Sequence, residues 1–72
     1  MKTLTSQEVK ILELIGQGFS SVQIGKVLGI SSHTVETHRK NLLLKFDAKN
    51  AAELIRKAIQ KRLLNINGVE NE

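Results

Sequence analysis

Four helix-start signals divide this short chain and constrain its fold more than any other feature. In each, a residue with a side-chain oxygen stands where it can accept a hydrogen bond from the third amide of a following helix. The four signals are Thr5 with Glu8, Ser20 with Gln23, Ser31, and Asn50 with Glu53. Glycines follow the first two apolar stripes, where they can end a helix. The pattern predicts helices over about 6–17, 20–28, 32–45 and 50–64, and therefore an all-α fold.

The size of the chain and its lack of cysteine limit how such a fold is stabilised. The 72 residues suffice for one small domain and contain no Cys, so neither disulfides nor thiolate zinc sites can stabilise it. A chain of this size has no room for a two-lobed catalytic cleft, and no nucleophile or acid–base pair is evident. His33 and His38 lie five residues apart, on different faces of a helix. We therefore expect no enzyme activity, no metal and no cofactor.

The charge of the chain favours a nucleic-acid partner. The formal net charge is +4 and the sequence pI is about 9.8. Residues 31–62 carry most of this charge, with eight cations against three carboxylates. The longest aliphatic run, residues 42–44, is far too short for a bilayer, and residues 1–10 contain no apolar signal segment. We expect a cytoplasmic protein with no membrane partner.

The second and third predicted helices have the pattern of a helix-turn-helix. Only three or four residues separate them, including Gly29, and Gly25 is small where the two backbones approach. On the third helix, Val35, Leu42 and Phe46 share a buried side. The opposite side is polar apart from one Leu and comprises His33, Glu36, Thr37, Lys40, Asn41 and Leu44. Such a helix fits the major groove of duplex DNA when a preceding helix braces it.

Short motifs occur along about residues 4–63, namely Leu4-Thr5-Ser6-Gln7-Glu8, Gly18-Phe19-Ser20, Ile24-Gly25, Leu28-Gly29-Ile30-Ser31, Thr34-Val35, His38, Asn41-Leu42 and Lys45-Phe46. Together they resemble the LuxR-type effector domain. The resemblance implies a four-helix DNA-binding domain of bacterial transcription regulators, with a tri-helical core and a C-terminal dimerisation helix. It also implies a receiver or ligand-sensing domain upstream, so the 72 residues are expected to be part of a larger regulator. RNA polymerase is a further candidate partner.

The polar face of the third helix supplies the candidate base-reading residues. By position, the residues that read bases in this family correspond to Glu36, Thr37 and Lys40, and the exposed face selects the same three. Lys40 can donate to guanine, Glu36 can accept from cytosine N4, and the Thr37 methyl can pack on a thymine methyl. His33 on the same face is a fourth candidate. Candidates for phosphate contact are helix starts, hydroxyls and one cation, namely Ser20, Ser32, Thr34 and Lys45.

The predicted fourth helix has a wider apolar stripe than a small bundle needs to bury. The surplus suggests a homodimer formed through Leu54, Ala58 and Ile59. We place the domain at residues 1–64 and a polar tail at 65–72. His38, at the edge of the apolar arc of the third helix, is interpreted mainly as a structural residue. The cations of the fourth helix are most simply a solvated face.

Two alternatives remain open from the sequence. One is a helical bundle for protein interaction, which would use the fourth-helix stripe and make the polar face irrelevant. The other is a sigma-factor-like promoter-reading domain, which has a similar helical outline. The spacing from Thr34-Val35 to Lys45-Phe46, with His38 and Asn41 between, favours the LuxR type.

Overall fold

The structure is a computed structural model that describes residues 4–61. Its elements are four α-helices: α1 (Ser6–Gly16), α2 (Ser21–Leu28), α3 (Ser32–Phe46) and α4 (Ala51–Gln60). The all-α, four-helix prediction is confirmed. The predicted tail at 65–72, and residues 62–64 of the predicted fourth helix, lie outside the described residues. No helix within residues 4–61 is long and apolar enough to cross a membrane.

All four predicted cap residues begin a helix. The Thr5 hydroxyl accepts from the Glu8 amide at 3.1 Å, and the Glu8 carboxylate accepts from the Thr5 amide at 3.0 Å. Ser20 and Gln23 form the same reciprocal pair at the start of α2. Ser31 and Asn50 accept from the third amides of α3 and α4. These bonds satisfy amides that a helix cannot pair internally, which is why short local motifs fix the starts.

Three of the helices end in the same way, around a residue in the left-handed conformation. The amide that follows the left-handed residue donates back five residues: Phe19 to Leu14, Ile30 to Gly25, and Ala48 to Leu43. The left-handed residues are Gly18, Gly29 and Asp47, at φ of 93°, 74° and 54°. The sequence predicted that a glycine ends each of the first two helices. It gave no signal for a left-handed residue at Asp47, and α3 runs one residue further than predicted, to Phe46.

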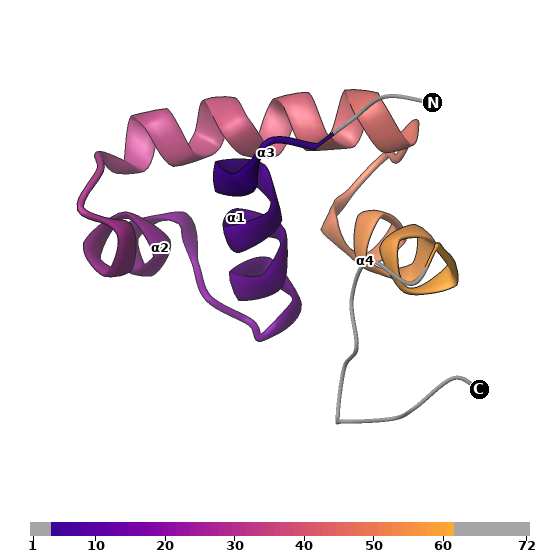
Figure 1. Cartoon of the computed structure of the whole chain (residues 1–72), viewed down its shortest axis with the longest axis horizontal. Coiled ribbons are helices and arrows are strands. Elements are labelled where there is room, and N and C mark those ends of the chain that lie inside the picture. Colours follow the sequence, from indigo (N-terminus) through magenta and orange to yellow (C-terminus); the bar gives the residue numbers. More distant parts are fainter. Residues whose placement is uncertain (1–3, 62–72) are drawn as a thin grey trace.

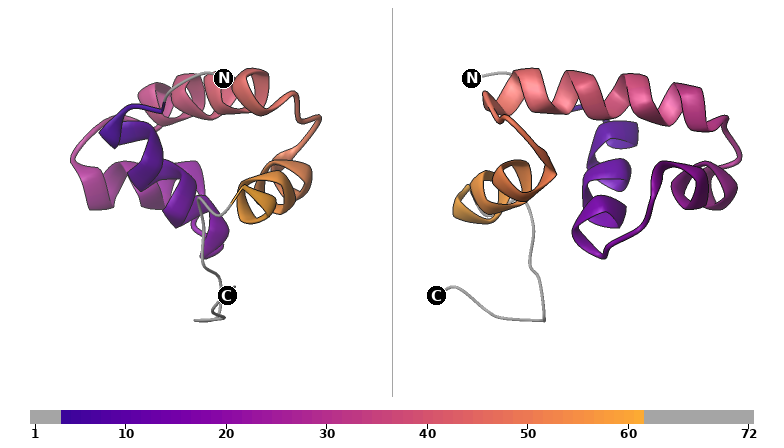
Figure 2. Two further views of the ribbon diagram at one scale, coloured as in Figure 1. Left: turned by 45° about the vertical axis from the view of Figure 1, so that its right-hand side comes forward. Right: turned by 180° about the vertical axis from the view of Figure 1, so that it is seen from behind.

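Helix α3 packs against each of the other three helices (Figure 1). In that view it runs across the top, with α2 below its N-terminal end, α1 below its middle and α4 below its C-terminal end. The reverse view shows the same order of helices along α3 (Figure 2). One core fills the space between α3 and the other three. It comprises Ile11, Leu12, Ile15, Ile24, Val35, Leu42, Phe46, Leu54 and Ala58. The predicted buried side of α3 is confirmed.

The turn between α2 and α3 depends on a close backbone approach at Gly25. A Cβ atom at this position would lie 2.6 Å from the Ile30 carbonyl oxygen. Gly25 is buried, and its own carbonyl accepts from the amides of Gly29 and Ile30. The absence of a side chain thus lets the start of α3 approach α2, as the sequence predicted.

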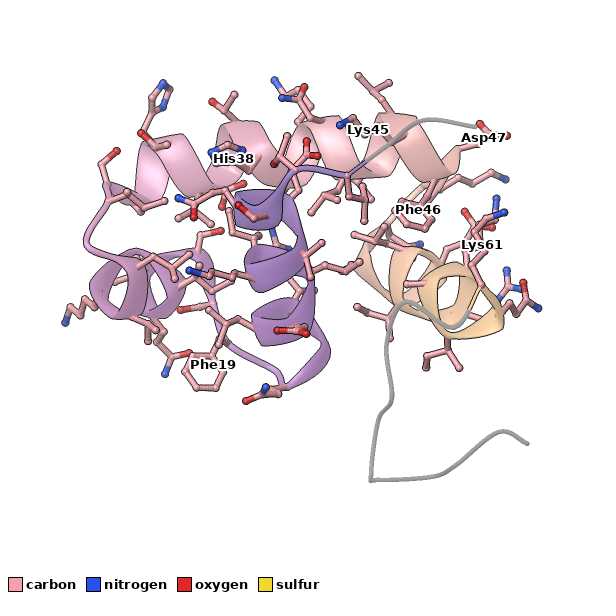
Figure 3. All side chains as sticks on the ribbon, viewed as in Figure 1. Phe19, His38, Lys45, Phe46, Asp47 and Lys61 are labelled. Atoms are coloured by element: carbon pink, nitrogen blue, oxygen red, sulfur yellow. The ribbon has the colours of Figure 1, made fainter. Side chains whose placement is uncertain are left out.

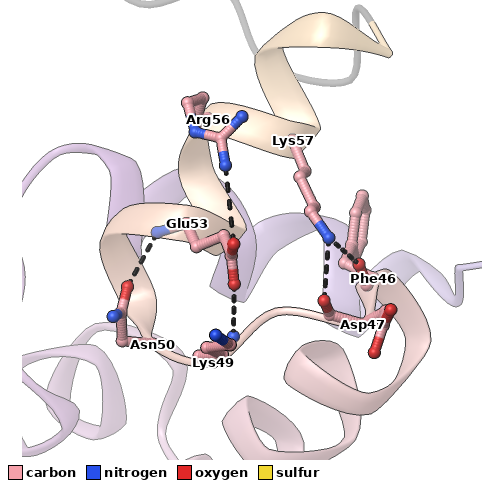
Figure 4. Close-up of polar contacts among 7 residues, drawn as sticks. All are labelled: Phe46, Asp47, Lys49, Asn50, Glu53, Arg56 and Lys57. Atoms are coloured by element: carbon pink, nitrogen blue, oxygen red, sulfur yellow. Dashed lines mark hydrogen bonds and ion pairs between the residues drawn. The ribbon is translucent and has the colours of Figure 1, made fainter.

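Helix α4 is tied to the end of α3 by a lysine (Figure 4). The Lys57 ammonium donates to the carbonyls of Asp47 at 2.8 Å and Phe46 at 3.3 Å. These carbonyls are at the C-terminus of α3, where a helix dipole favours a cation. The cations of α4 are therefore not all a solvated face, because Lys57 is half-buried and caps α3.

Candidate nucleic-acid interface

The four predicted base-reading residues share the outer side of α3. His33, Glu36, Thr37 and Lys40 are all exposed, while Val35 and Leu42 on the opposite side are fully buried. The core thus holds one side of the helix and leaves the other to solvent, so the polar side chains are presented on a rigid element. Asn41 and Leu44 are exposed as well, and Leu44 is 69% exposed.

The four predicted base-reading residues line an open pocket of about 480 Å³ beside α3. Its far wall is the start of α4, at Asn50 and Ala51. The α3 side chains that line it are His33, Glu36, Thr37, Arg39, Lys40 and Leu43. Arg39, which sequence reasoning missed, is thereby placed beside the predicted face. The signal for it was its position next to Lys40, but helical periodicity alone assigns it to neither the apolar nor the polar side.

Two of the four side chains have their orientation constrained by hydrogen bonds. The Thr37 hydroxyl donates to the His33 carbonyl at 3.3 Å, so its methyl is the part of the side chain left for contact. The Glu36 carboxylate accepts from the Ser21 hydroxyl at 2.5 Å through Oε2. Ser21 was not a predicted site residue, and it comes from α2. Only the crossing of α2 and α3 brings these two residues together.

The predicted phosphate contacts fall into two groups. Ser20, Ser32 and Thr34 lie at the starts of α2 and α3 and are exposed. Ser20 caps α2, and the Thr34 hydroxyl lies 2.9 Å from that of Ser31. Amides at helix starts attract anions, so this end of the motif is suited to phosphate. The fourth candidate, Lys45, lies in the last turn of α3, away from the other three.

Lys45 contacts a carboxylate of α1 (Figure 3 labels its position). Its ammonium lies 2.6 Å from Glu8 Oε1, and the Glu8 residue is 4% exposed. Burial by itself would raise the pKa of Glu8. The hydrogen bonds from Lys45 and Thr5 and the charges of Lys45 and His38 outweigh burial and hold that pKa below its ordinary value. Glu8 is thus a buried carboxylate whose charge is paired with the Lys45 ammonium.

His38 lies on α3 two turns before Lys45 (Figure 3), and its charge acts on the Glu8 carboxylate. It is half-buried, and its Nδ1 is buried without a hydrogen-bond partner among residues 4–61. A structural histidine was expected to be hydrogen-bonded, and Nδ1 does not make that bond here, so the role of His38 stays a prediction.

The three predicted dimer residues differ in how far they are buried. Leu54 is 1% exposed and Ala58 is fully buried, both within the core of the chain itself. In this conformation neither side chain is exposed to a second copy, and the dimer interface stays a prediction. Ile59 is half-buried and packs only at the edge of the core, as does Ile55. The apolar stripe of α4 is wide because part of it packs against α1 and α3 within the same chain.

Comparison with known proteins places the chain in a family. Residues 2–58 match the family model described as bacterial regulatory proteins, luxR family. The chain is 38% identical over 64 residues to the oxygen regulatory protein NreC of Staphylococcus haemolyticus (strain JCSC1435). That match covers 89% of this chain and 30% of NreC. It is also 40% identical over 63 residues to YgeK of Escherichia coli (strain K12), described as an uncharacterized response regulatory protein. Here the coverage is 88% of this chain and 43% of YgeK.

Solved structures agree with these matches. The response regulator ChrA of a heme-sensing two-component system superposes with a TM-score of 0.84 at 34% identity, over 89% of this chain and 32% of ChrA. The Vibrio cholerae VqmA dimer, described among LuxR-type receptors, also superposes with a TM-score of 0.84, at 33% identity, over 88% of this chain and 28% of VqmA. The chain thus spans less than half the length of each of these relatives. The LuxR-type helix-turn-helix is a DNA-binding domain of transcription regulators and not an enzyme. The chain belongs to the LuxR family of bacterial regulatory proteins.

Proposed function

We propose that this domain recognises specific sequences in duplex DNA by placing α3 in the major groove. The observation that carries the proposal is the division of α3 into two sides. Its inner side is held by the core, and its outer side presents His33, Glu36, Thr37 and Lys40 to solvent. A helix braced in this way fits the major groove, where each base pair offers a distinct set of donors and acceptors.

Three of the four outer residues have a chemistry that suits a particular base edge. The exposed Lys40 ammonium can donate to guanine O6 or N7, and Glu36 can accept from cytosine N4. The methyl of Thr37 suits a thymine methyl, since its hydroxyl is already bonded to the His33 carbonyl. Ser20, Ser32 and Thr34 at the two helix starts would bind phosphates and set the register of α3 in the groove.

The proposal includes binding as a dimer, with a smaller surface than the sequence suggested. Of the three predicted residues, only Ile59 remains available, together with Ile55 one turn earlier. Sedimentation of the chain on a saturated DNA site tests this part. Two copies per site support the dimer, and one copy per site contradicts it. Ile59→Glu should then halve the stoichiometry or abolish binding to a two-fold site.

The domain would act within a longer regulator that has a receiver or sensor domain upstream. The support is the greater length of NreC, YgeK, ChrA and VqmA and the description of two of them as response regulators. RNA polymerase remains a candidate partner of that regulator. Binding to the core polymerase alone would instead favour the sigma-factor-like alternative.

Selection of bound duplexes from a random DNA library, at near-physiological salt, tests the central part of the proposal. Enrichment of a two-fold symmetric sequence would support specific recognition by a dimer. Salt-sensitive binding without enrichment would reduce the role of the outer face to phosphate contact.

A further inference from the structure

The hydrogen bond between Ser21 and Glu36 joins α2 to the outer face of α3. Ser21 is the first residue of α2 and is half-buried, and Glu36 is an exposed residue of α3. The hydroxyl donates to Oε2 of the carboxylate across fifteen positions of sequence. The bond is thus a feature of the tertiary structure and belongs to no local motif. Its acceptor is one of the residues proposed to read bases.

The bond changes what the Glu36 side chain can do. An exposed glutamate ordinarily samples several rotamers about three torsions, and holding it in one of them on binding costs conformational entropy. A hydrogen bond to a carboxylate is among the stronger protein hydrogen bonds. Here it engages Oε2 and leaves Oε1 with its full capacity to accept. The donor also lies on the helix that braces α3, so it moves with the motif as one unit.

We propose that Ser21 is a specificity-determining residue that positions Glu36 for recognition of one base pair. With Oε2 held by Ser21, Oε1 is pre-oriented as the acceptor for the amino group of a cytosine. The role of Ser21 is to sharpen the choice of base and not to supply affinity by its own contact with DNA. The inference rests on the proposed function, because it requires that Glu36 read a base.

The test is a set of binding measurements on a selected duplex and on all its single base-pair variants. Glu36→Ala first identifies the base pair whose preference depends on Glu36. Ser21→Ala should then reduce discrimination at that same base pair by about 2- to 10-fold, as expected for one side chain that is no longer held. Preferences at the other base pairs should stay as in the wild type.

Further variants separate positioning from other effects. Ser21→Thr keeps the hydroxyl and should retain wild-type discrimination. Ser21→Ala in the Glu36→Ala background should have no further effect, since nothing remains to be positioned. Ser6→Ala is the matched control, because Ser6 is likewise the first residue of a helix and is exposed on α1. Ser21→Cys, which has a similar size and a weak donor, replaces Ser21→Ala if the latter does not fold.

Several results would overturn the inference. An equal loss of affinity on every duplex would make Ser21 a phosphate contact. Unchanged discrimination in Ser21→Ala would show that Glu36 needs no positioning. If Glu36→Ala alters no preference, the base-reading role of Glu36 fails and the inference fails with it. If the wild type itself shows no preference among duplexes, the proposed function has failed, and that result is distinct from the others.

Discussion

The Lys45 ammonium lies 2.6 Å from Glu8 Oε1 and joins the start of α1 to the last turn of α3. Glu8 serves two purposes at once, because the same oxygen accepts from the Thr5 amide that begins α1. One carboxylate therefore fixes a helix start and ties that start to the helix proposed to enter DNA.

Removing the lysine side of this pair should destabilise the fold. Lys45→Met keeps the aliphatic stem but leaves the buried Glu8 carboxylate without its cation. We expect the free energy of unfolding to fall by about 1–3 kcal/mol, below the value for a fully buried pair because Lys45 is partly exposed. Urea denaturation measures the change, with Lys49→Met as an exposed control. Equal stability of the two variants would contradict a structural role for the pair.

The pair should also make the fold sensitive to acid. Because the pKa of Glu8 is lowered from its ordinary 4.5, the folded state binds a proton at this site less readily than the unfolded state. Its contribution to stability is therefore complete above about pH 4.5 and is lost as the pH falls through the lowered pKa. Glu8→Gln should flatten the decline of stability in this range, measured by thermal unfolding against pH. Glu13→Gln, at an exposed position of α1, is the control and should leave the Glu8 contribution in place.

Lys45 remains a predicted phosphate contact, and the ion pair sharpens its test. Lys45→Ala should weaken binding on every duplex and lower the salt slope by about one. Glu8→Gln breaks the same ion pair but keeps the cation, so it should leave the salt slope unchanged or slightly higher. If Glu8→Gln weakens binding as much as Lys45→Ala, the lysine acts through the fold and not on phosphate.

Asp47 offers a stabilising substitution. It ends α3 at φ 54° and ψ 46°, a left-handed conformation that glycine adopts most readily, that asparagine also adopts at helix ends, and that aspartate adopts only occasionally. Its negative charge also lies at the end of a helix dipole that favours cations. We expect Asp47→Asn to raise the free energy of unfolding by about 0.3–1 kcal/mol. At the left-handed residue that ends α2, Gly29→Ala should lower the free energy of unfolding by about 1 kcal/mol or more, because alanine is strained at a positive φ. A Tm shift of the opposite sign in either variant would contradict this reasoning.

Lys40 tests the outer face of α3 most simply. Lys40→Ala should lose about 1–3 kcal/mol of binding free energy on the preferred duplex and relax the preference at one base pair. Fluorescence anisotropy with the preferred duplex and its single variants measures both. Lys10→Ala, an exposed lysine of α1, is the matched control. An equal loss of affinity on every sequence would make Lys40 a phosphate contact instead.

Local signals explain why so much of this fold can be predicted from the sequence. The capping residues Thr5, Ser20, Ser31 and Asn50 act within three residues of themselves, so their pattern survives any tertiary arrangement. The two sides of α3 follow from helical periodicity in the same way. Gly18 and Gly29 indicated in the sequence where α1 and α2 end. Asp47 took the same conformation without that signal, which moved the end of α3 by one residue.

Contacts between helices could not be predicted, since they depend on how the helices cross. The bonds of Ser21 with Glu36 and of Lys45 with Glu8 span 15 and 37 positions. The apolar stripe of α4 shows the same limit. Its width indicated surplus surface, but periodicity does not say that Leu54 and Ala58 face the core of their own chain.

Base recognition by α3 is tested by a triple variant of its outer face, Glu36→Ala, Thr37→Ala and Lys40→Ala. None of the three side chains belongs to the core, so the variant should unfold at nearly the wild-type temperature. Its affinity for the selected duplex and for a scrambled duplex would be measured at near-physiological salt. We expect the ratio of the two affinities to fall to near one while weak, salt-sensitive binding remains. A triple variant that still discriminates as the wild type does would show that α3 does not read the bases.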